Sequence, residues 1–417
     1  MTNFDKLLIV LKRANFMTKL AFKDLEFHET NGIVRAYFLR NFYFDINKEE
    51  LALIGKFKIG KNSISFEEKE QTARRKFNFL LEKGLSQLIS LQGKPATFVH
   101  KDLLPLIGSL YFGLIDRGTN IIEVRPVTGC NLDCIFCSVD LSRRVRDFVV
   151  QTDYLVREFR KLVKLKLEAV DSVEAHLNAQ GETLFYGPIA ELVKGIAETK
   201  GVNTISLDTN GCLLTEKKID ALVKAGLTRF NISLNSLNQA TATKLANASY
   251  PLKHVVDMCK YAAKKADLLI APVWLHGIND KDIEDIIKFA LSLNKKQSVP
   301  LIGIQNFLEY KYGKRPVKQK SWQELYSWLG KLEQKYKTKL ILSRKDFNIE
   351  KAKVLDKPFR KDDKVRAEIV CPGKFPNEKL AQADDRIISL PSCSKEKGSI
   401  RIKITRDKYN IFYGRPS

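Results

Sequence analysis

Three of the seven cysteines in this 417-residue chain lie within eight positions, in the stretch VRPVTGCNLDCIFCSVD at residues 124–140. The spacing of Cys130, Cys134 and Cys137 indicates thiolates that share a metal centre. A structural zinc site usually needs four ligands, and no fourth Cys or His lies nearby, although His176 on a later strand could reach the site. Three thiolates also suit a [4Fe–4S] cluster with one iron left open, and a buried trio of packing thiols is the alternative without chemistry.

Short β-rich runs alternate with helical stretches around these cysteines. The expected strands are IIEVRPV, VEAHLNA, TISLDT, FNISLN, LLIAPVWL and PLIGIQN, and the expected helices cover 153–167, 189–199, 216–226, 251–265, 282–293 and 322–336. Six strands that are each followed by a helix predict right-handed βαβ units and a parallel sheet, too few to close an eight-stranded barrel. The cysteines follow the first strand, at the end of such sheets where active sites collect.

Both flanks of this α/β region have a different pattern. Residues 1–117 contain expected strands at 33–46 and 55–66 and an amphipathic helix within 67–91. Near residue 355 the alternation stops, and short strands at 365–375, 386–392, 399–407 and 410–416 predict a small β-barrel. The predicted fold is therefore α/β: a partial (βα)6 barrel at 118–345, an N-terminal α+β region at 1–117 and a small C-terminal β-barrel at 355–417.

The segment CNLDCIFC resembles the CxxxCxxC signature of the radical S-adenosylmethionine (radical SAM) enzymes, including the aromatic Phe136 before the third cysteine. The resemblance implies that Cys130, Cys134 and Cys137 are catalytic and hold a [4Fe–4S] cluster whose open iron binds SAM, with Phe136 beside the cofactor. In that family an electron from the reduced cluster splits SAM, and the resulting 5′-deoxyadenosyl radical abstracts hydrogen from the substrate. A low-potential electron donor such as ferredoxin or flavodoxin is implied as a partner.

The end of the second strand, NAQGETLFY, resembles the Gly-Gly-Glu element of the same family through Gly181 and Glu182. The resemblance implies that the glycine lets the backbone approach SAM closely and that the carboxylate pairs with the methionine ammonium group. An ordinary turn is the alternative for a Gly-Glu pair. Thr183 departs from the family pattern, in which many relatives carry proline at this position.

Later strand ends supply the other cofactor-binding candidates. Asn210 follows the third strand in LDTNGCLL, and Ser233 and Asn235 in NISLNS share one face of the fourth strand. The resemblance assigns such polar groups to the SAM carboxylate and ribose. For each of them a structural role is the alternative. At the ends of the fifth and sixth strands, the resemblance implies contact with adenine for Gly277, Asn279 and Gln305.

The composition restricts the compartment and the class of protein. Hydrophobic residues make up 44% and charged residues 29%, which fits an ordinary globular protein. The longest apolar run, LLPLIGSLYFGLI, has 13 residues, fewer than the roughly 20 that span a bilayer. The start, MTNFDKLLIVLKRANF, has an early Asp5 and no small-residue cleavage site, so we expect no signal peptide. An odd number of cysteines, three of them clustered, favours a reducing cytoplasm over a disulfide framework.

The net charge of +23 is consistent with a polyanionic partner, and a uniformly solvated basic surface is the alternative. The tail VCPGKFPNEKLAQADDRIISL is similar to a TRAM domain, a small RNA-binding β-barrel, through Gly373, Glu378, Leu380, Ala381 and Arg386. Two further basic runs, SRRVR and YKYGKRPVKQK, follow predicted strand ends and would surround the mouth of the site. Residues of the tail suited to phosphate contact or base stacking are Arg401, Lys403, Arg406, Lys408, Tyr409, Phe412, Tyr413 and Arg415.

These observations predict a radical SAM enzyme that modifies RNA, with tRNA as the leading substrate. A second hypothesis keeps the chemistry and changes the substrate to a protein or an isoprenoid lipid. A third is an RNA-binding protein with a vestigial barrel, against which the intact cysteine triad argues. The four remaining cysteines are expected to serve packing, with a redox pair, a thiyl relay or a metal half-site as alternatives for the last two: Cys212, Cys259, Cys371 and Cys393.

Overall fold

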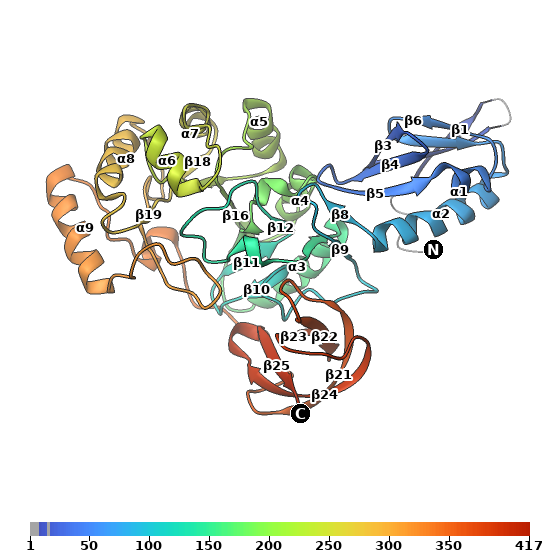
Figure 1. Cartoon of the computed structure of the whole chain (residues 1–417). Helices are drawn as coiled ribbons and strands as arrows, with labels where there is room; N and C mark the ends of the chain where they lie inside the picture. The colour runs from blue at the N-terminus through green and yellow to red at the C-terminus, as the bar shows by residue number, and fades with distance from the viewer. Residues whose placement is uncertain (1–7, 15–16) are drawn as a thin grey trace.

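The computed structural model describes residues 8–14 and 17–417 and arranges them in three parts (Figure 1). A part made of small N-terminal sheets lies on one side of the central α/β part, and the C-terminal barrel lies on another. Residues 1–7, 15 and 16, from the start that we predicted to hold no signal peptide, lie outside the described residues. Within the described ranges, no helix has the length and apolar character needed to cross a membrane.

Two four-stranded antiparallel sheets build the N-terminal part. The first has the order β1 (Leu8–Ala14), β2 (Met17–Phe22), β7 (Ser63–Phe66) and β6 (Phe57–Gly60). The second has the order β3 (Leu25–Thr30), β4 (Ile33–Phe38), β5 (Phe42–Asn47) and β8 (Ile89–Ser90). The stretches predicted as strands at 33–46 and 55–66 are therefore hairpins, and the first reverses at Leu39 and Arg40, which both have positive φ.

Two helices complete this part: α1 (Lys48–Ala52) and α2 (Glu70–Ser86), the latter within the predicted range. Phe77 on α2 packs its ring against Phe22 and Phe27, with ring centroids 5.3 and 6.3 Å apart. The apolar face of α2 thus packs over the sheets, in a hydrophobic core that is continuous with that of the central part.

A six-stranded sheet forms the central part. Its strands, in spatial order, are β10 (Gly113–Asp116), β11 (Ile121–Arg125), β14 (Val173–Leu177), β16 (Val202–Thr209), β17 (Arg229–Ile232) and β18 (Asp267–Ile270). The last five are mutually parallel, as predicted, whereas β10 pairs antiparallel with β11. The expected sixth βα strand is reduced to a bridge between Ile270 and Ile302 and to the pair of β19 (Val273–Trp274) with β20 (Gln305–Asn306). The predicted partial α/β barrel is confirmed, with an antiparallel strand added at its edge.

The helices that follow the strands flank the sheet on its outer side (Figure 1). The six predicted ones are present as α3 (Thr152–Lys166), α4 (Ile189–Ala197), α5 (Glu216–Ala225), α7 (Leu252–Lys265), α8 (Asp280–Ser292) and α9 (Trp322–Tyr336). A further helix, α6 (Gln239–Ala246), was not predicted, because its sequence QATATKLA has little apolar periodicity. Its start is fixed by the Asn238 side chain, which accepts a hydrogen bond from the Thr241 backbone N–H at 3.0 Å.

Four short strands connect the parts around the cysteine loop. β12 (Thr128–Gly129) pairs with β15 (Gln180–Gly181), and β9 (Ala96–Val99) pairs with β13 (Asp147–Val150). The second pair joins the N-terminal part directly to the segment that follows the cysteines. Single 3-10 turns occur at Leu141–Arg143, Thr183–Phe185, Arg344–Phe347 and Lys408–Asn410.

The C-terminal strands form a closed five-stranded barrel, as predicted. Its order is β21 (Lys364–Pro372), β22 (Lys379–Ala383), β23 (Arg386–Leu390), β25 (Phe412–Pro416) and β24 (Gly398–Arg406). Phe412 is fully buried in the barrel core, so it is unavailable for the base stacking expected from the sequence. Cys393 packs in that same core, whereas Cys371 packs against the core of the central part, and both are free thiols.

Candidate functional site

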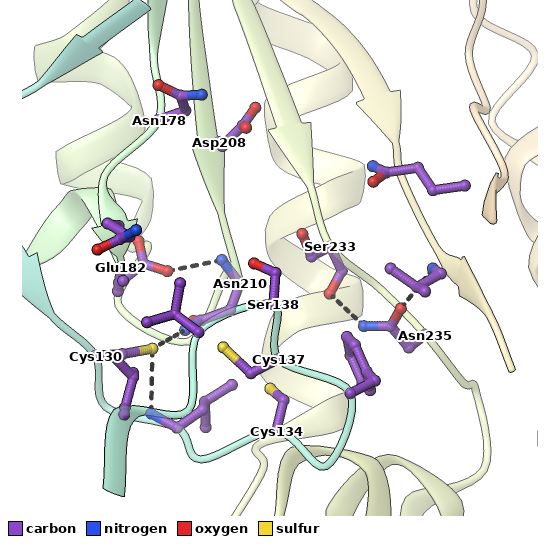
Figure 2. Close-up of a pocket in the computed structure, with 18 of the residues that line it drawn as sticks. Cys130, Cys134, Cys137, Ser138, Asn178, Glu182, Asp208, Asn210, Ser233 and Asn235 are labelled. Atoms are coloured by element: carbon purple, nitrogen blue, oxygen red, sulfur yellow. Dashed lines mark hydrogen bonds between the residues drawn. The ribbon is translucent and has the colours of Figure 1, made fainter. Parts of the chain in front are cut away.

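The three clustered cysteines line one cavity of about 520 Å³ at the carboxyl ends of the central strands. Figure 2 shows their sulfur atoms directed into a common space, with Glu182 and Asn210 beside them. Two elements hold the loop that carries them. The end of α6 accepts the backbone N–H of Ile135 at 3.0 Å through Leu245, and Lys314 donates its backbone N–H to the Cys137 carbonyl at 3.0 Å.

The chemistry of the donor set distinguishes a cluster from a single ion. Among the described residues, no three His, Cys, Asp or Glu side chains converge closely enough to hold one metal ion. The zinc alternative also loses its fourth ligand, because the two ring nitrogens of His176 contact Ser206 Oγ at 2.8 Å and Asp208 Oδ2 at 3.2 Å. In a [4Fe–4S] cluster each thiolate bonds a different iron, so the sulfur atoms stand farther apart than around one ion.

Burial controls the protonation of these thiols. It raises the pKa of Cys130 and of Cys137, and it raises the pKa of Cys134 to about 12. The buried thiols are therefore protonated at neutral pH in the absence of a metal centre, and binding of iron releases their protons. At Cys137 the positive charges of Lys374 and Lys314 act to lower the pKa, but the effect of burial is larger and the pKa stays raised.

Gly181 and Glu182 help to hold the cysteine loop in place. A Cβ on Gly181 would lie 2.0 Å from the carbonyl oxygen of Gly129, so a glycine is needed for contact with the strand that leads into Cys130, and Gly181 also lines the cavity. Glu182 lies in the cavity wall but is only 2% exposed. The hydroxyl of Thr183, at the position of the missing proline, accepts the Ala179 N–H at 3.1 Å and closes the same turn.

The Glu182 carboxylate fixes the end of β16. It accepts hydrogen bonds from the backbone N–H of Leu184 at 2.9 Å, from Thr209 Oγ1 at 2.7 Å and from the backbone N–H of Asn210 at 2.8 Å. Asn210 in turn donates its amide to Asn131 at 2.9 Å and approaches the Cys130 sulfur at 3.9 Å. Glu182 and Asn210 thus connect the second and third strand ends to the cysteine loop.

The remaining predicted residues divide into two groups. Phe136, Ser233, Asn235 and Gln305 line the same cavity as the cysteines. Gly277 and Asn279 do not line it, and their contact with adenine stays a prediction. Asn279 is fully buried and supports the cavity indirectly, because its amide donates to the carbonyls of Asn235 at 3.1 Å and Val273 at 3.0 Å.

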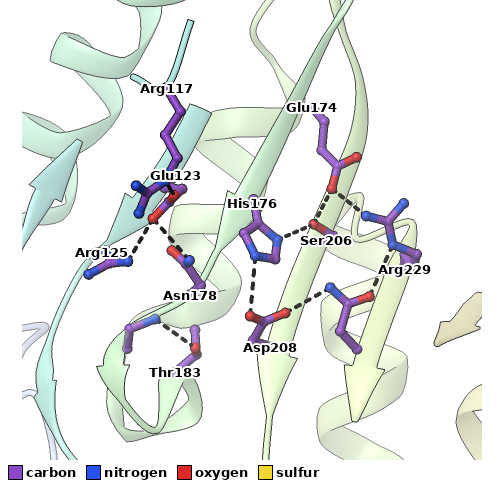
Figure 3. A network of polar contacts seen from close by, with 12 residues as sticks. Arg117, Glu123, Arg125, Glu174, His176, Asn178, Thr183, Ser206, Asp208 and Arg229 are labelled. Atoms are coloured by element: carbon purple, nitrogen blue, oxygen red, sulfur yellow. Dashed lines mark hydrogen bonds and ion pairs between the residues drawn. The ribbon is translucent and has the colours of Figure 1, made fainter. Parts of the chain in front are cut away.

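A network of polar side chains, which we call the interior network, continues from the cavity into the barrel (Figure 3). On β11, Glu123 accepts hydrogen bonds from Arg117, from Arg125 at 2.7 Å and from Asn178 at 3.2 Å. Deeper inside, a second cavity of about 310 Å³ shares Asp208, Ser233 and Gln305 with the first. Its other polar lining residues are Glu174, His176, Arg229 and Asn231.

The charges of the interior network are paired. Glu174 binds Arg229, Asp208 accepts the Asn231 amide at 2.8 Å, and Asp208 also contacts His176. Burial lowers the pKa of His176, but the charge of Asp208 and its hydrogen bond outweigh burial, so the pKa is raised overall. The sequence analysis missed this network. The sequence signal that could have indicated this network is the occurrence of polar residues at alternate positions of the strands, because a parallel sheet normally buries both faces of its strands.

The basic runs of the sequence are only partly at the surface. In SRRVR, Arg144 is buried and pairs with Asp147 at 2.8 Å, and Arg146 donates to Thr97 at 3.2 Å. In YKYGKRPVKQK, Lys314 donates to the Asp133 carbonyl at 2.9 Å and binds its carboxylate. Arg143, Lys311 and Arg315 of the same two runs are exposed, so the expected contact with a polyanion stays a prediction.

Comparison with known proteins agrees with the geometry. The family model of the Radical SAM superfamily matches residues 124–290. An uncharacterized protein of Methanocaldococcus jannaschii is 38% identical over 348 residues, which cover 76% of this chain and 80% of that protein. The GTP 3′,8-cyclase of Aquifex aeolicus is 29% identical over 181 residues, 43% of this chain and 55% of the enzyme, so the chain spans about half of it.

A crystal structure of methylornithine synthase is also similar, with a TM-score of 0.40 and 15% identity, and the match covers 51% of this chain and 60% of that one. The family match begins at Val124 in β11 and ends at the last turns of α8. It therefore includes the cysteine loop and the ends of all five parallel strands.

Proposed function

The chain belongs to the radical SAM superfamily, and from that premise we propose that it modifies a nucleotide of RNA, with tRNA as the substrate class. As a radical SAM enzyme it binds a [4Fe–4S] cluster and SAM. The residues present fit both groups. Cys130, Cys134 and Cys137 would hold the cluster, and the polar cavity wall beside them offers partners for SAM. When bound, the two groups supply a 5′-deoxyadenosyl radical that takes hydrogen from the substrate.

The side chains of the site position and shield this chemistry. Glu182 fixes the backbone of Asn210, and Asn210 reaches the base of the cysteine loop. On the opposite wall, Asn235 is held by Val273, whose backbone N–H it accepts at 2.8 Å. The apolar groups Phe136 and Phe307 pack together beside the cysteines and keep water from the thiol end of the cavity.

The interior network favours a polar substrate. Charged and amide side chains from four neighbouring strands line the two connected cavities. An isoprenoid chain placed there would remove water from these charged groups, and desolvation of charges is costly even when they are paired. A heterocyclic base with its own donors and acceptors fits such a wall, so we favour a nucleotide over an isoprenoid lipid.

The observation that carries RNA is the outward face of the C-terminal barrel, which we call the barrel basic face. Its exposed and half-exposed basic side chains occupy three adjacent strands: Lys364, Arg366, Arg401, Lys403 and Arg415. Cross-strand register puts like charges opposite each other, with Lys364 opposite Lys403 and Arg366 opposite Arg401. Lys403 is paired with Asp362 at 2.9 Å, but Arg366 and Arg401 have no acidic partner within the described residues. Because like charges in such a pair destabilise a sheet, a polyanion that neutralises them is the partner we infer.

A free nucleotide is the second candidate. The relative from Aquifex aeolicus is named as a GTP 3′,8-cyclase. GTP would use the same polar cavities as a base within RNA. It would leave the barrel basic face without a function, and for this reason we place RNA first. A protein substrate is the remaining enzyme hypothesis.

The experiment that tests the proposal is anaerobic reconstitution with iron and sulfide, followed by measurement of 5′-deoxyadenosine with SAM and dithionite. The reaction is run alone, with bulk tRNA and with GTP. We expect stimulation by tRNA, weaker stimulation by GTP, and no product in Cys130→Ala. The reverse order, or stimulation by neither, would overturn the RNA proposal, and a reconstituted protein without iron would revive the vestigial-barrel hypothesis.

A charge-reversal variant separates the barrel basic face from the overall charge. In Arg366→Glu/Arg401→Glu we expect weaker tRNA binding, with the logarithmic salt dependence reduced by about one per lost phosphate contact, and unchanged cleavage of SAM without RNA. The control is Lys331→Glu/Lys337→Glu, which reverses two exposed charges, one in α9 and one at its C-terminal end. Equal losses in both variants would mean that only the net charge of the protein attracts RNA.

A further inference from the structure

The loop between β21 and β22 leaves the C-terminal barrel and enters the central part beside the cysteines. Glu378 closes this loop, because its carboxylate accepts the backbone N–H of Lys374 at 2.9 Å and the hydroxyl of Tyr111 at 2.7 Å. Phe375 stacks on Tyr312, with ring centroids 5.4 Å apart. The carbonyl of Lys374 accepts the backbone N–H of Val145, from the segment after the cysteine loop, at 2.8 Å.

At the tip of this loop the Lys374 side chain is completely buried. Its ammonium group donates to the side-chain oxygen of Gln180 and lies 5.5 Å from the centre of the Tyr111 ring. Gln180 is the residue before Gly181 and lines the cysteine cavity. Lys374 thus reaches the wall of the cavity from outside, through a neutral amide.

No carboxylate contacts this ammonium group directly. Within the described parts of the chain, Lys374 forms no ion pair. The other fully buried lysine in these parts, Lys166, is paired with Asp116. The charged groups near enough to influence Lys374 are Asp147 and Cys137 on the negative side and Arg144 and Arg125 on the positive side. A buried cation without a direct partner is costly, so its presence needs a compensating negative charge.

A cluster on three thiolates supplies that charge. Four irons, four sulfides and three thiolates carry a net negative charge, and the charge grows by one when the cluster is reduced. A low-potential donor gives up one electron and the cluster gains it, with no proton transferred. A nearby positive charge stabilises the more negative, reduced state, since net charge and hydrogen bonding around the sulfurs set the potential of such clusters.

We propose that Lys374, a residue of the C-terminal barrel, is an electrostatic element of the cluster site and makes the cluster easier to reduce. The barrel then contributes to the redox chemistry in addition to any contact with RNA. Burial lowers the pKa of Lys374 to about 7 while Asp147 acts to raise it, and the cluster, of which the Cys137 thiolate is a part, acts in the same direction. The inference depends on cluster binding and not on the identity of the substrate.

The test is a redox titration of the reconstituted full chain, monitored by electron paramagnetic resonance without SAM or RNA. In Lys374→Met, which keeps the side-chain length and removes the charge, we expect the ratio of reduced to oxidised cluster at a fixed potential to fall about tenfold, equivalent to about 59 mV for one electron. Lys374→Arg, which retains a charge, should stay near the wild-type value.

Lys379→Met is the matched control, because Lys379 is a buried lysine of the same barrel that pairs with Glu396 at 2.6 Å. Its potential and iron content should equal those of the wild type. An unchanged potential in Lys374→Met would overturn the proposal. So would loss of iron from Lys374→Met with retention in Lys379→Met, because the lysine would then hold the site together rather than tune it.

Discussion

Two buried carboxylates beside the cysteine cavity show how partners decide charge. Burial raises the pKa of Glu182, and hydrogen bonds from Asn210, Leu184 and Thr209 only partly oppose it. Burial acts on Glu123 in the same direction, but the charge of Arg125 and the hydrogen bond from Arg117 outweigh it and lower the pKa to about 2. The first carboxylate is surrounded by neutral donors, and the second by guanidinium groups.

The Glu123 ion pairs predict a defined pH dependence of stability. Because the folded-state pKa is below the unfolded value of 4.5, the contribution is complete above pH 4.5 and is lost as the pH falls toward about 2. In this window the free energy of unfolding of the wild type, relative to Glu123→Gln, should decrease by on the order of 3 kcal/mol. Denaturant unfolding of both apo-proteins at several pH values measures it. A difference independent of pH would contradict the prediction.

At the scale of elements, the cysteine loop is held by segments that are distant in sequence. The end of α6, the loop after β20 and the pair of β12 with β15 all bond to its backbone or flank it. The βα alternation and the barrel strands could be predicted, because burial imposes a period on the sequence. The support of the loop could not, since α6 has no apolar periodicity and Lys314 looks like any surface lysine until the fold brings it to Asp133.

The same limit applies to the candidate site. The cysteine motif and its register with the strand ends were sufficient to place Glu182, Asn210, Ser233 and Asn235 around one cavity. Asn279 looked equivalent to these four residues in the sequence. The chain turns at Gly277, however, and the Asn279 side-chain amide is used to hold the neighbouring backbone. A sequence motif gives the strand end on which a residue lies, whereas the direction of its side chain depends on tertiary contacts.

Gly181→Ala tests the contact between β12 and β15. The added Cβ would overlap the Gly129 backbone, so the strand that leads into Cys130 must move. We expect reduced iron content after reconstitution and a lower melting temperature. Gly330→Ala in α9 is the control, because its Cβ would meet open space, and alanine should stabilise that helix by about 0.5–1 kcal/mol. Full iron content in Gly181→Ala would show that the loop tolerates the displacement.

At the scale of the whole molecule, the C-terminal barrel is an integral part of the fold and not an appended module. Leu380 and Ile387 belong to the hydrophobic core of the central part. Backbone hydrogen bonds join the two, from Ile387 to the Ile107 carbonyl at 2.8 Å and from Phe412 to the Gly108 carbonyl at 3.0 Å. A Cβ on Gly108 would lie 2.2 Å from the Ile387 carbonyl oxygen, which shows how closely the surfaces approach.

Removal of residues 355–417 should therefore damage the cysteine site as well as the proposed RNA-binding face. The truncation exposes the apolar surface under Leu380 and Ile387 and leaves Tyr111 and Gln180 without Glu378 and Lys374. We expect an aggregation-prone protein with little iron after reconstitution, measured by gel filtration and iron analysis. A monodisperse truncated protein with a full iron complement would contradict this expectation.

The buried loop of the barrel also sets an order of events during synthesis. Lys374 leaves the ribosome about 240 residues after Cys137, and at ordinary elongation rates that delay is roughly 10 to 50 seconds. Throughout that time the three thiols exist without the lysine and without the segment that packs behind them. Iron delivered to the nascent chain would meet an unfinished site, so the site can be completed only after the loop that carries Lys374 has been synthesised.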